Sequence, residues 1–111
     1  MMLSTDIWVA ALIRRAELAG AFATVARKGD ARAGAVVVRT RRLEDGACRL
    51  FVSATGPEGD TVWIQPLREA GEAELDAYAE RARRIDPDIW VVEIEDRQGR
   101  HFLTEPVAQE G

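Results

Sequence analysis

The chain has very few of the residues that build disulfides, metal centres and catalytic triads. Its 111 residues include one cysteine, Cys48, and one histidine, His101. A lone cysteine cannot form an internal disulfide, so nothing in the sequence points to an oxidising compartment. With one imidazole, neither a Ser/His/Asp nor a Cys/His triad can be assembled with any specificity. We therefore expect no catalytic residue and no cofactor, and we favour a protein that is not an enzyme.

Long apolar runs are missing as well. The run at 7–13 is far shorter than the roughly 20 residues that a membrane-spanning helix requires. Arg14 and Arg15 follow this run, whereas the basic residues of a signal peptide precede its apolar region. We therefore expect a cytoplasmic protein without a membrane segment.

The composition that remains is that of a globular domain. Apolar residues make up 47% of the chain and charged residues 31%, a balance that argues against disorder. The length is close to the commonest size of a domain, so we expect a single domain over 1–111 with one core.

The charges are divided unevenly along the chain. Residues 1–55 carry nine basic and five acidic side chains, a net charge of +4, whereas residues 56–111 carry six basic and fourteen acidic ones, a net charge of −8. Such a division indicates either a basic binding face or two halves that attract each other across the fold.

Two helices are predicted. The first, over 6–19, follows the potential N-cap side chains of residues 4–6 and ends before Gly20. A strand over 7–13 is the alternative, because that run is apolar on every side. The second, over 72–85, has acidic residues in its first turns and basic residues in its last, as the helix dipole favours. Its apolar stripe consists of Leu75, Tyr78, Ala79, Ala82 and Ile85.

Strands are predicted over 22–28 and 61–65, and two hairpins add further strands. The first hairpin joins AVVVRTRRL (35–43) to CRLFVSA (48–54), and the second begins with the strand over 88–96. A three-residue loop over 44–46, with Gly46 in the left-handed conformation, would place Val38 opposite Val52 and Thr40 opposite Leu50. A type I turn over 96–99 would return the chain as a last strand, 100–103, that pairs with 88–96.

The order α-β-β-β-β-α-β-β indicates an α+β fold, an antiparallel sheet of about five to six strands packed against two helices. We expect the tail over 105–111 to fray.

Three segments resemble a family of small alphaproteobacterial proteins that is known as domain of unknown function number fourteen ninety-one. They are WVAALIRR (8–15), ARKGDARAGAVVV (26–38) and DPDIWVVEIEDRQGRHFL (86–103). The resemblance spans nearly the whole chain and implies a single cytosolic bacterial domain. It implies no activity, cofactor or catalytic residue.

One candidate metal site lies in the second hairpin. In the predicted register, Glu93, Glu95 and His101 share the outward face, and Asp86 or Asp88 would extend the set. The chain offers no second histidine and no H-x-x-x-H spacing. We favour a solvated hairpin tip over a metal or acid/base site.

A second candidate is the glycine-bounded loop after the first strand. Arg27, Lys28 and Arg32 and the backbone N–H groups there would suit a phosphate. The loop matches neither a P-loop nor G-x-G-x-x-G, so a plain strand-to-strand connection is favoured.

The third candidate is one face of the first hairpin. The predicted register places an aromatic ring among arginines, an arrangement that suits nucleic acid through stacking and phosphate contacts. The residues of this face are Arg39, Arg41, Arg49 and Phe51. An isoelectric point near 5.0 argues against nucleic acid. A solvated face, or one covered by helix 72–85 or by a second subunit, is the alternative.

Trp8, Trp63 and Trp90 are expected to anchor the core, because such side chains dominate the packing of a small domain. The hypothesis that we favour is a domain that binds a protein partner or a second copy of itself. A nucleic-acid or phosphate binder is the alternative, and a small metal-dependent enzyme is the third.

Overall fold

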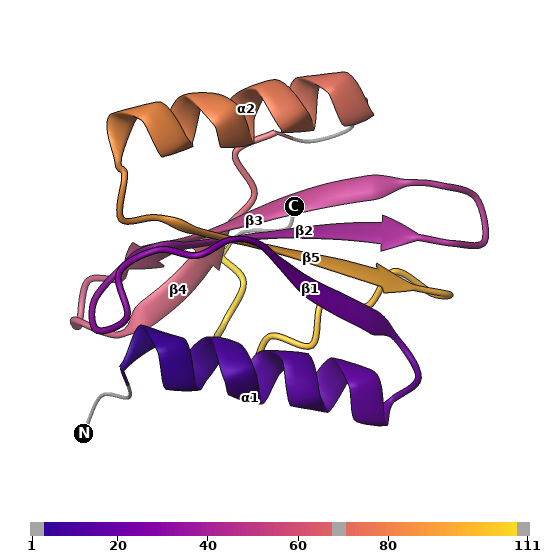
Figure 1. Cartoon of the computed structure of the whole chain (residues 1–111), viewed down its shortest axis with the longest axis horizontal. Coiled ribbons are helices and arrows are strands. Elements are labelled where there is room, and N and C mark those ends of the chain that lie inside the picture. Colours follow the sequence, from indigo (N-terminus) through magenta and orange to yellow (C-terminus); the bar gives the residue numbers. More distant parts are fainter. Residues whose placement is uncertain (1–3, 68–70, 109–111) are drawn as a thin grey trace.

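A computed structural model describes residues 4–67 and 71–108 and shows one sheet between two helices (Figure 1). Helix α1 (Thr5–Leu18) and helix α2 (Glu72–Ile85) lie on opposite faces of the sheet. Its strands are β1 (Phe22–Arg27), β2 (Val36–Arg42), β3 (Cys48–Thr55), β4 (Thr61–Ile64) and β5 (Trp90–Asp96). The α+β class and both helices are confirmed. No helix of the described residues is long and apolar enough to cross a membrane.

The sheet is mixed and not purely antiparallel as predicted. Its order is β1-β5-β2-β3-β4, and β5 runs antiparallel to β1 but parallel to β2. Strand β5 follows the crossover through α2 and inserts between two strands from the first half of the chain. Hairpin signals in a sequence identify only neighbours in the chain, so they do not reveal such an insertion.

The predicted strand over 100–103 is absent. The turn before it is confirmed, because the Gly99 N–H donates to the Asp96 carbonyl at 3.1 Å and Gly99 has a φ of 73°. Both edges of β5 are already occupied, by β1 and by β2, so no edge is left for a hairpin partner. The chain after the turn instead packs Phe102 and Leu103 against the core on the α1 side of the sheet.

The register of the first hairpin differs from the prediction by one residue. Val38 lies opposite Phe51 and Arg39 opposite Leu50. The loop has four residues, 43–46, and is closed by a hydrogen bond of 2.8 Å from the Arg42 N–H to the Ala47 carbonyl. Since side chains alternate along a strand, this shift moves every side chain of β3 to the other face.

The core has two parts, one on each face of the sheet. On the α1 side, buried residues of α1 and of all five strands belong to one cluster. The buried residues there include Val9, Leu12, Val38, Phe51, Trp63, Trp90, Val92 and Ile94. On the α2 side, the buried residues are Val37, Leu50, Leu75, Ile89 and Val91. Ile85, which the helical stripe assigned to this core, is 80% exposed.

The described part of the tail is bound and not frayed. The Trp63 N–H donates to the Pro106 carbonyl at 2.9 Å, and the Ala108 N–H donates to the Trp63 carbonyl at 2.7 Å. Val107 thereby forms a parallel bridge to the outer edge of β4. The rest of the segment that was predicted to fray, 109–111, lies outside the described residues. The tail thus covers part of one edge of the sheet.

Candidate functional site

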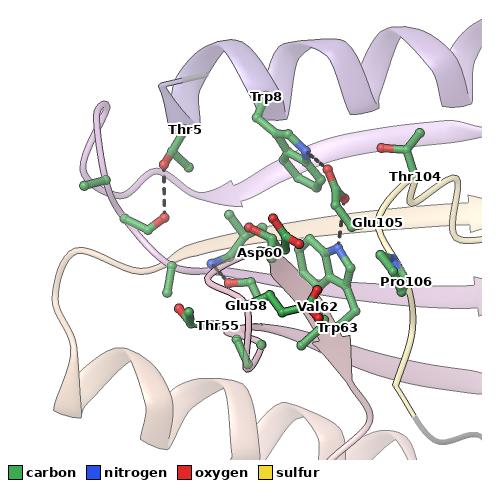
Figure 2. A pocket seen from close by; sticks show the side chains of 18 of the residues that line it. Thr5, Trp8, Thr55, Glu58, Asp60, Val62, Trp63, Thr104, Glu105 and Pro106 are labelled. Carbon is green, nitrogen blue, oxygen red and sulfur yellow. Dashed lines mark hydrogen bonds between the residues drawn. The ribbon is translucent and has the colours of Figure 1, made fainter. Parts of the chain in front are cut away.

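An open groove of about 1040 Å³ lies at one end of the sheet (Figure 2). Four parts of the chain form it: the start of α1, the loop at 32–35, the ends of β3 and β4 with the turn between them, and the tail at 104–106. These parts are distant in the sequence, and only the fold brings them together.

Two stacked indoles form one wall of the groove. The rings of Trp8 in α1 and Trp63 in β4 are 5.3 Å apart between centroids, with an interplanar angle of 28°. Both indoles donate to the carboxylate of Glu105, Trp8 at 2.9 Å and Trp63 at 3.0 Å. One carboxylate therefore links a helix, a strand and the tail, as Figure 2 shows.

Glu105 provides a fixed negative charge at this wall. Partial burial favours the protonated form, but hydrogen bonds from Trp63, Trp8 and Thr104 favour the ionised form and outweigh it. The net result is that the pKa of Glu105 lies below its usual value. Each carboxylate oxygen already accepts an indole N–H. The arrangement therefore suits electrostatic attraction and not proton transfer.

Two further carboxylates line the groove. Glu58 and Asp60 are exposed in the turn between β3 and β4, which is closed by a 2.7 Å bond from the Gly56 N–H to the Asp60 carbonyl. Within residues 4–67 and 71–108, neither side chain has a hydrogen bond or ion pair. The groove thus presents three carboxylates and one guanidinium, that of Arg32.

The loop that was predicted to bind phosphate instead supports α1. The Asp30 carboxylate accepts the N–H groups of Arg32 at 3.2 Å and Ala33 at 2.9 Å, which are the donors a phosphate would need. The Arg32 carbonyl in turn accepts the Thr5 N–H at the start of α1, at 3.2 Å. This loop is therefore a cap for the helix.

The basic side chains of this loop do not converge. Arg32 lines the groove, whereas Arg27 lies on the α2 side and donates to the Pro87 carbonyl at 3.3 Å. Lys28 is exposed. Close packing also restricts the loop, because a Cβ on Gly29 would lie 2.1 Å from the Asp88 carbonyl oxygen.

The predicted arginine face is divided between the two sides of the sheet. On the α2 side, Arg39 is 15% exposed and forms ion pairs with Glu72 at 2.8 Å and Asp76 at 2.5 Å. Arg39 also reaches Glu93 at 3.4 Å, and Arg41 reaches Glu72 at 3.3 Å. Basic residues of the first half of the chain thus attract acidic residues of the second half across the fold.

The other two members of that predicted face lie on the α1 side. The Arg49 guanidinium stands 5.1 Å from the centroid of the Phe51 ring and donates to the Gly99 carbonyl at 2.7 Å. Phe51 is fully buried. The structure therefore offers no single exposed platform made of these four residues.

The three candidate metal ligands do not come together, because the two glutamates and the histidine lie on opposite sides of the sheet. Glu93 pairs with Arg39 on the α2 side, and Glu95 lies beside Arg41 in the register of β5 and β2. The His101 ring packs on Phe51, which belongs to the core on the α1 side, at 5.0 Å between centroids. The described residues contain no group of three His, Cys, Asp or Glu side chains that could hold a metal ion.

Comparison with known proteins places the chain among uncharacterised relatives. The sequence model of a family described as "Protein of unknown function (DUF1491)" matches residues 3–104. No curated protein matches.

Solved structures of similar proteins exist. A crystal structure of a DUF1491 family protein from Caulobacter crescentus is similar at 73% identity, with a TM-score of 0.92 over 96% of this chain and 99% of that one. An NMR structure of a protein of that family from the same organism shares 72% identity over 98% and 99%, with a TM-score of 0.92. The solution structure of Atu0922 from A. tumefaciens shares 35% identity over all of both chains, with a TM-score of 0.82.

Proposed function

The chain belongs to the DUF1491 family of proteins of unknown function, and we propose that it is a non-enzymatic domain that binds a basic segment of a partner protein in the groove beside Trp8 and Trp63. The membership confirms the resemblance found in the sequence motifs. Because the family has no assigned function, the proposal rests on the geometry of this chain alone.

The observation that carries the proposal is the chemistry of the groove. The groove is lined by the exposed carboxylates of Glu58 and Asp60, by the charged Glu105 and by the stacked indoles of Trp8 and Trp63. A lysine or arginine side chain is complementary to this lining, because its cation attracts the carboxylates and its aliphatic stem or guanidinium plane packs on the half-buried ring of Trp8, which stacks on the buried Trp63. Anionic ligands such as nucleic acid are disfavoured by the same three carboxylates.

The shape favours an extended segment of protein. The groove is open, and its volume of about 1040 Å³ lies at the upper limit of the roughly 300–1,000 Å³ typical of small-molecule pockets. The net charge of −4 also attracts a basic partner over a longer range. We place the protein in the cytoplasm as part of this proposal, and cell fractionation tests that placement.

We expect a short synthetic peptide of alternating lysine and alanine to bind, as measured by calorimetry at low salt. The double variant Glu58→Gln/Asp60→Asn should weaken this binding about tenfold, which corresponds to ~1.4 kcal/mol. The affinity should also fall as salt is added, because the attraction is between exposed charges.

The control is Glu44→Gln, which removes an exposed carboxylate from the loop between β2 and β3, outside the groove lining. This variant should bind the peptide like the parent protein. Equal weakening by the control would show that only net charge matters, and absence of binding to the parent at low salt would refute the proposal.

A further inference from the structure

The tail covers the outer edge of β4 at Trp63 but not at Thr61. Trp63 uses both its N–H and its C=O for the tail, in a parallel bridge with Val107. The next step of such a ladder would join the Thr61 N–H to the Thr104 carbonyl and the Thr61 carbonyl to the N–H of Pro106. Proline has no N–H, and the described residues form no backbone hydrogen bond between Thr61 and Thr104. The ladder of the tail therefore ends before Thr61.

Both backbone groups of Thr61 point away from the sheet. The Asp60 carbonyl and the Thr61 N–H belong to one trans peptide unit and point in opposite directions. The Asp60 carbonyl accepts the Gly56 N–H inside the hairpin at 2.7 Å, so the Thr61 N–H points outward. In a strand the C=O of a residue lies on the same side as its N–H. In the part of the chain that the structure describes, no residue outside β3 bonds to either group.

These unused groups lie in the groove that carries the proposed function. Thr61 is exposed and lines the groove together with the carboxylates of Glu58, Asp60 and Glu105. Figure 2 shows its neighbours in the chain, Asp60 and Val62, among the lining side chains. One outward N–H and one outward C=O match the backbone of one residue in an extended peptide, as in the addition of a strand to a sheet edge.

The charges of the groove select the occupant of this edge. Three carboxylates attract a basic segment and repel an acidic one. A second copy of this chain carries a net charge of −4, so electrostatic repulsion disfavours it here.

We propose that the basic segment binds as an added strand, with its backbone paired to the N–H and C=O of Thr61 and its cationic side chains beside the carboxylates. This inference rests on the proposed function and adds the mode of recognition. The occupant is an extended peptide and not merely a cation. Backbone pairing supplies affinity for any sequence, and the carboxylates restrict the choice to basic ones. Pro106 keeps the position open, because it ends the ladder of the tail.

Calorimetry of Thr61→Pro with the lysine–alanine peptide tests the pairing. Proline removes the N–H and places its ring on the side where the added strand would lie. The fold tolerates it, because Thr61 is the first residue of an edge strand and its N–H points outward. We expect the affinity to fall roughly three- to tenfold, which is the value of about one hydrogen bond. The control Thr61→Ala keeps the N–H and should bind like the parent.

Spermine separates backbone pairing from charge. It carries spaced ammonium groups but no peptide groups, so the parent and Thr61→Pro should bind it equally. Equal binding of spermine also verifies that the groove of the variant is intact. If Thr61→Pro weakens both ligands equally, the variant has damaged the groove, and the amide signal of the parent protein decides.

The Thr61 amide is followed by NMR while the peptide is added to the parent. Pairing should move its proton signal downfield and slow its exchange with solvent. If the peptide binds while the Thr61 amide stays unprotected, the added strand is overturned and the basic groove stands, as it is if Thr61→Pro binds the peptide like the parent. If no peptide binds at low salt, both proposals are overturned. A dimer of the parent that Thr61→Pro abolishes would assign the edge to a second copy and overturn the basic partner.

Discussion

Replacing Trp63 with alanine is expected to lower the free energy of unfolding by about 3–5 kcal/mol, the usual cost of truncating a buried aromatic side chain. Trp63 is 1% exposed, stacks on Trp8 and donates to Glu105. Its backbone also holds the tail against β4. The substitution leaves a large cavity and removes one of the two indole donors to a partly buried carboxylate. Urea denaturation at neutral pH, followed by circular dichroism, measures the loss.

Trp63→Phe separates packing from hydrogen bonding. Phenylalanine keeps an aromatic ring beside Trp8 but cannot donate to Glu105, so we expect a smaller loss of about 1–3 kcal/mol. If Trp63→Ala cost less than about 1 kcal/mol, well below the usual range for such truncations, the wall of the groove would not be the anchor that the structure indicates.

The second large effect is expected at Asp96, the last residue of β5. Its carboxylate is 2% exposed and accepts four hydrogen bonds: two from the Arg100 guanidinium at 2.8 and 3.0 Å, and two from the N–H groups of Gln98 and Arg100 at 3.0 and 2.9 Å. Asp96→Asn removes the charge and replaces one acceptor oxygen by a donor. We expect a loss of about 2–3 kcal/mol, since hydrogen bonds to charged groups are the stronger kind.

The same site predicts a dependence on pH. Hydrogen bonds from Arg100, the largest cause, outweigh burial and lower the pKa of Asp96 to about 2. An aspartate in the unfolded chain has a pKa of about 3.9. Because the folded value is the lower one, the stabilisation is fully present above about pH 4 and is lost as the pH falls through about 2.

Denaturation curves at several pH values test this. The parent protein should lose stability between about pH 4 and pH 2, and Asp96→Asn should lack that part of the slope. Asp88→Asn is the control, because Asp88 is exposed and its carboxylate forms no hydrogen bond with the described residues. An unchanged slope in Asp96→Asn would show that other carboxylates cause the acid sensitivity.

Local signals in the sequence were sufficient for the helices and for most of the strands. The periodic apolar stripe and the dipole-compatible charges located α2 at its observed bounds, Glu72–Ile85. The turn at 96–99 followed from Asp at its first position and Gly at its last. These features depend on contacts within a few residues, which is the range that periodicity and turn preferences describe.

Non-local pairing was not predictable in the same way. The insertion of β5 between β1 and β2 depends on which strands compete for the same partner. Because both edges of β5 are then paired, the strand predicted over 100–103 has no edge to pair with. A single extra residue in the loop at 43–46 was enough to divide the predicted arginine face between two sides of the sheet. The choice between loops of three and four residues is not fixed by Gly46, which adopts a positive φ in either.

The groove was missed for a related reason. Its walls come from segments that are far apart in the sequence, so no local pattern brings them together. Glu105 in addition belongs to a tail whose composition suggested fraying. One signal was available: tryptophans that pack in or against a core need acceptors for their indole N–H groups, and one carboxylate can serve two of them.

The central claim, that the groove binds a basic segment, is tested most directly by NMR of the isotope-labelled protein during titration with the lysine–alanine peptide. The proposal predicts progressive shifts of the indole N–H signals of Trp8 and Trp63 and of the amides of Glu58 and Asp60. The Trp90 indole, which donates to the Asp30 carbonyl outside the groove lining, should remain unchanged. Absence of shifts at millimolar peptide, or shifts confined to other surfaces, would contradict it.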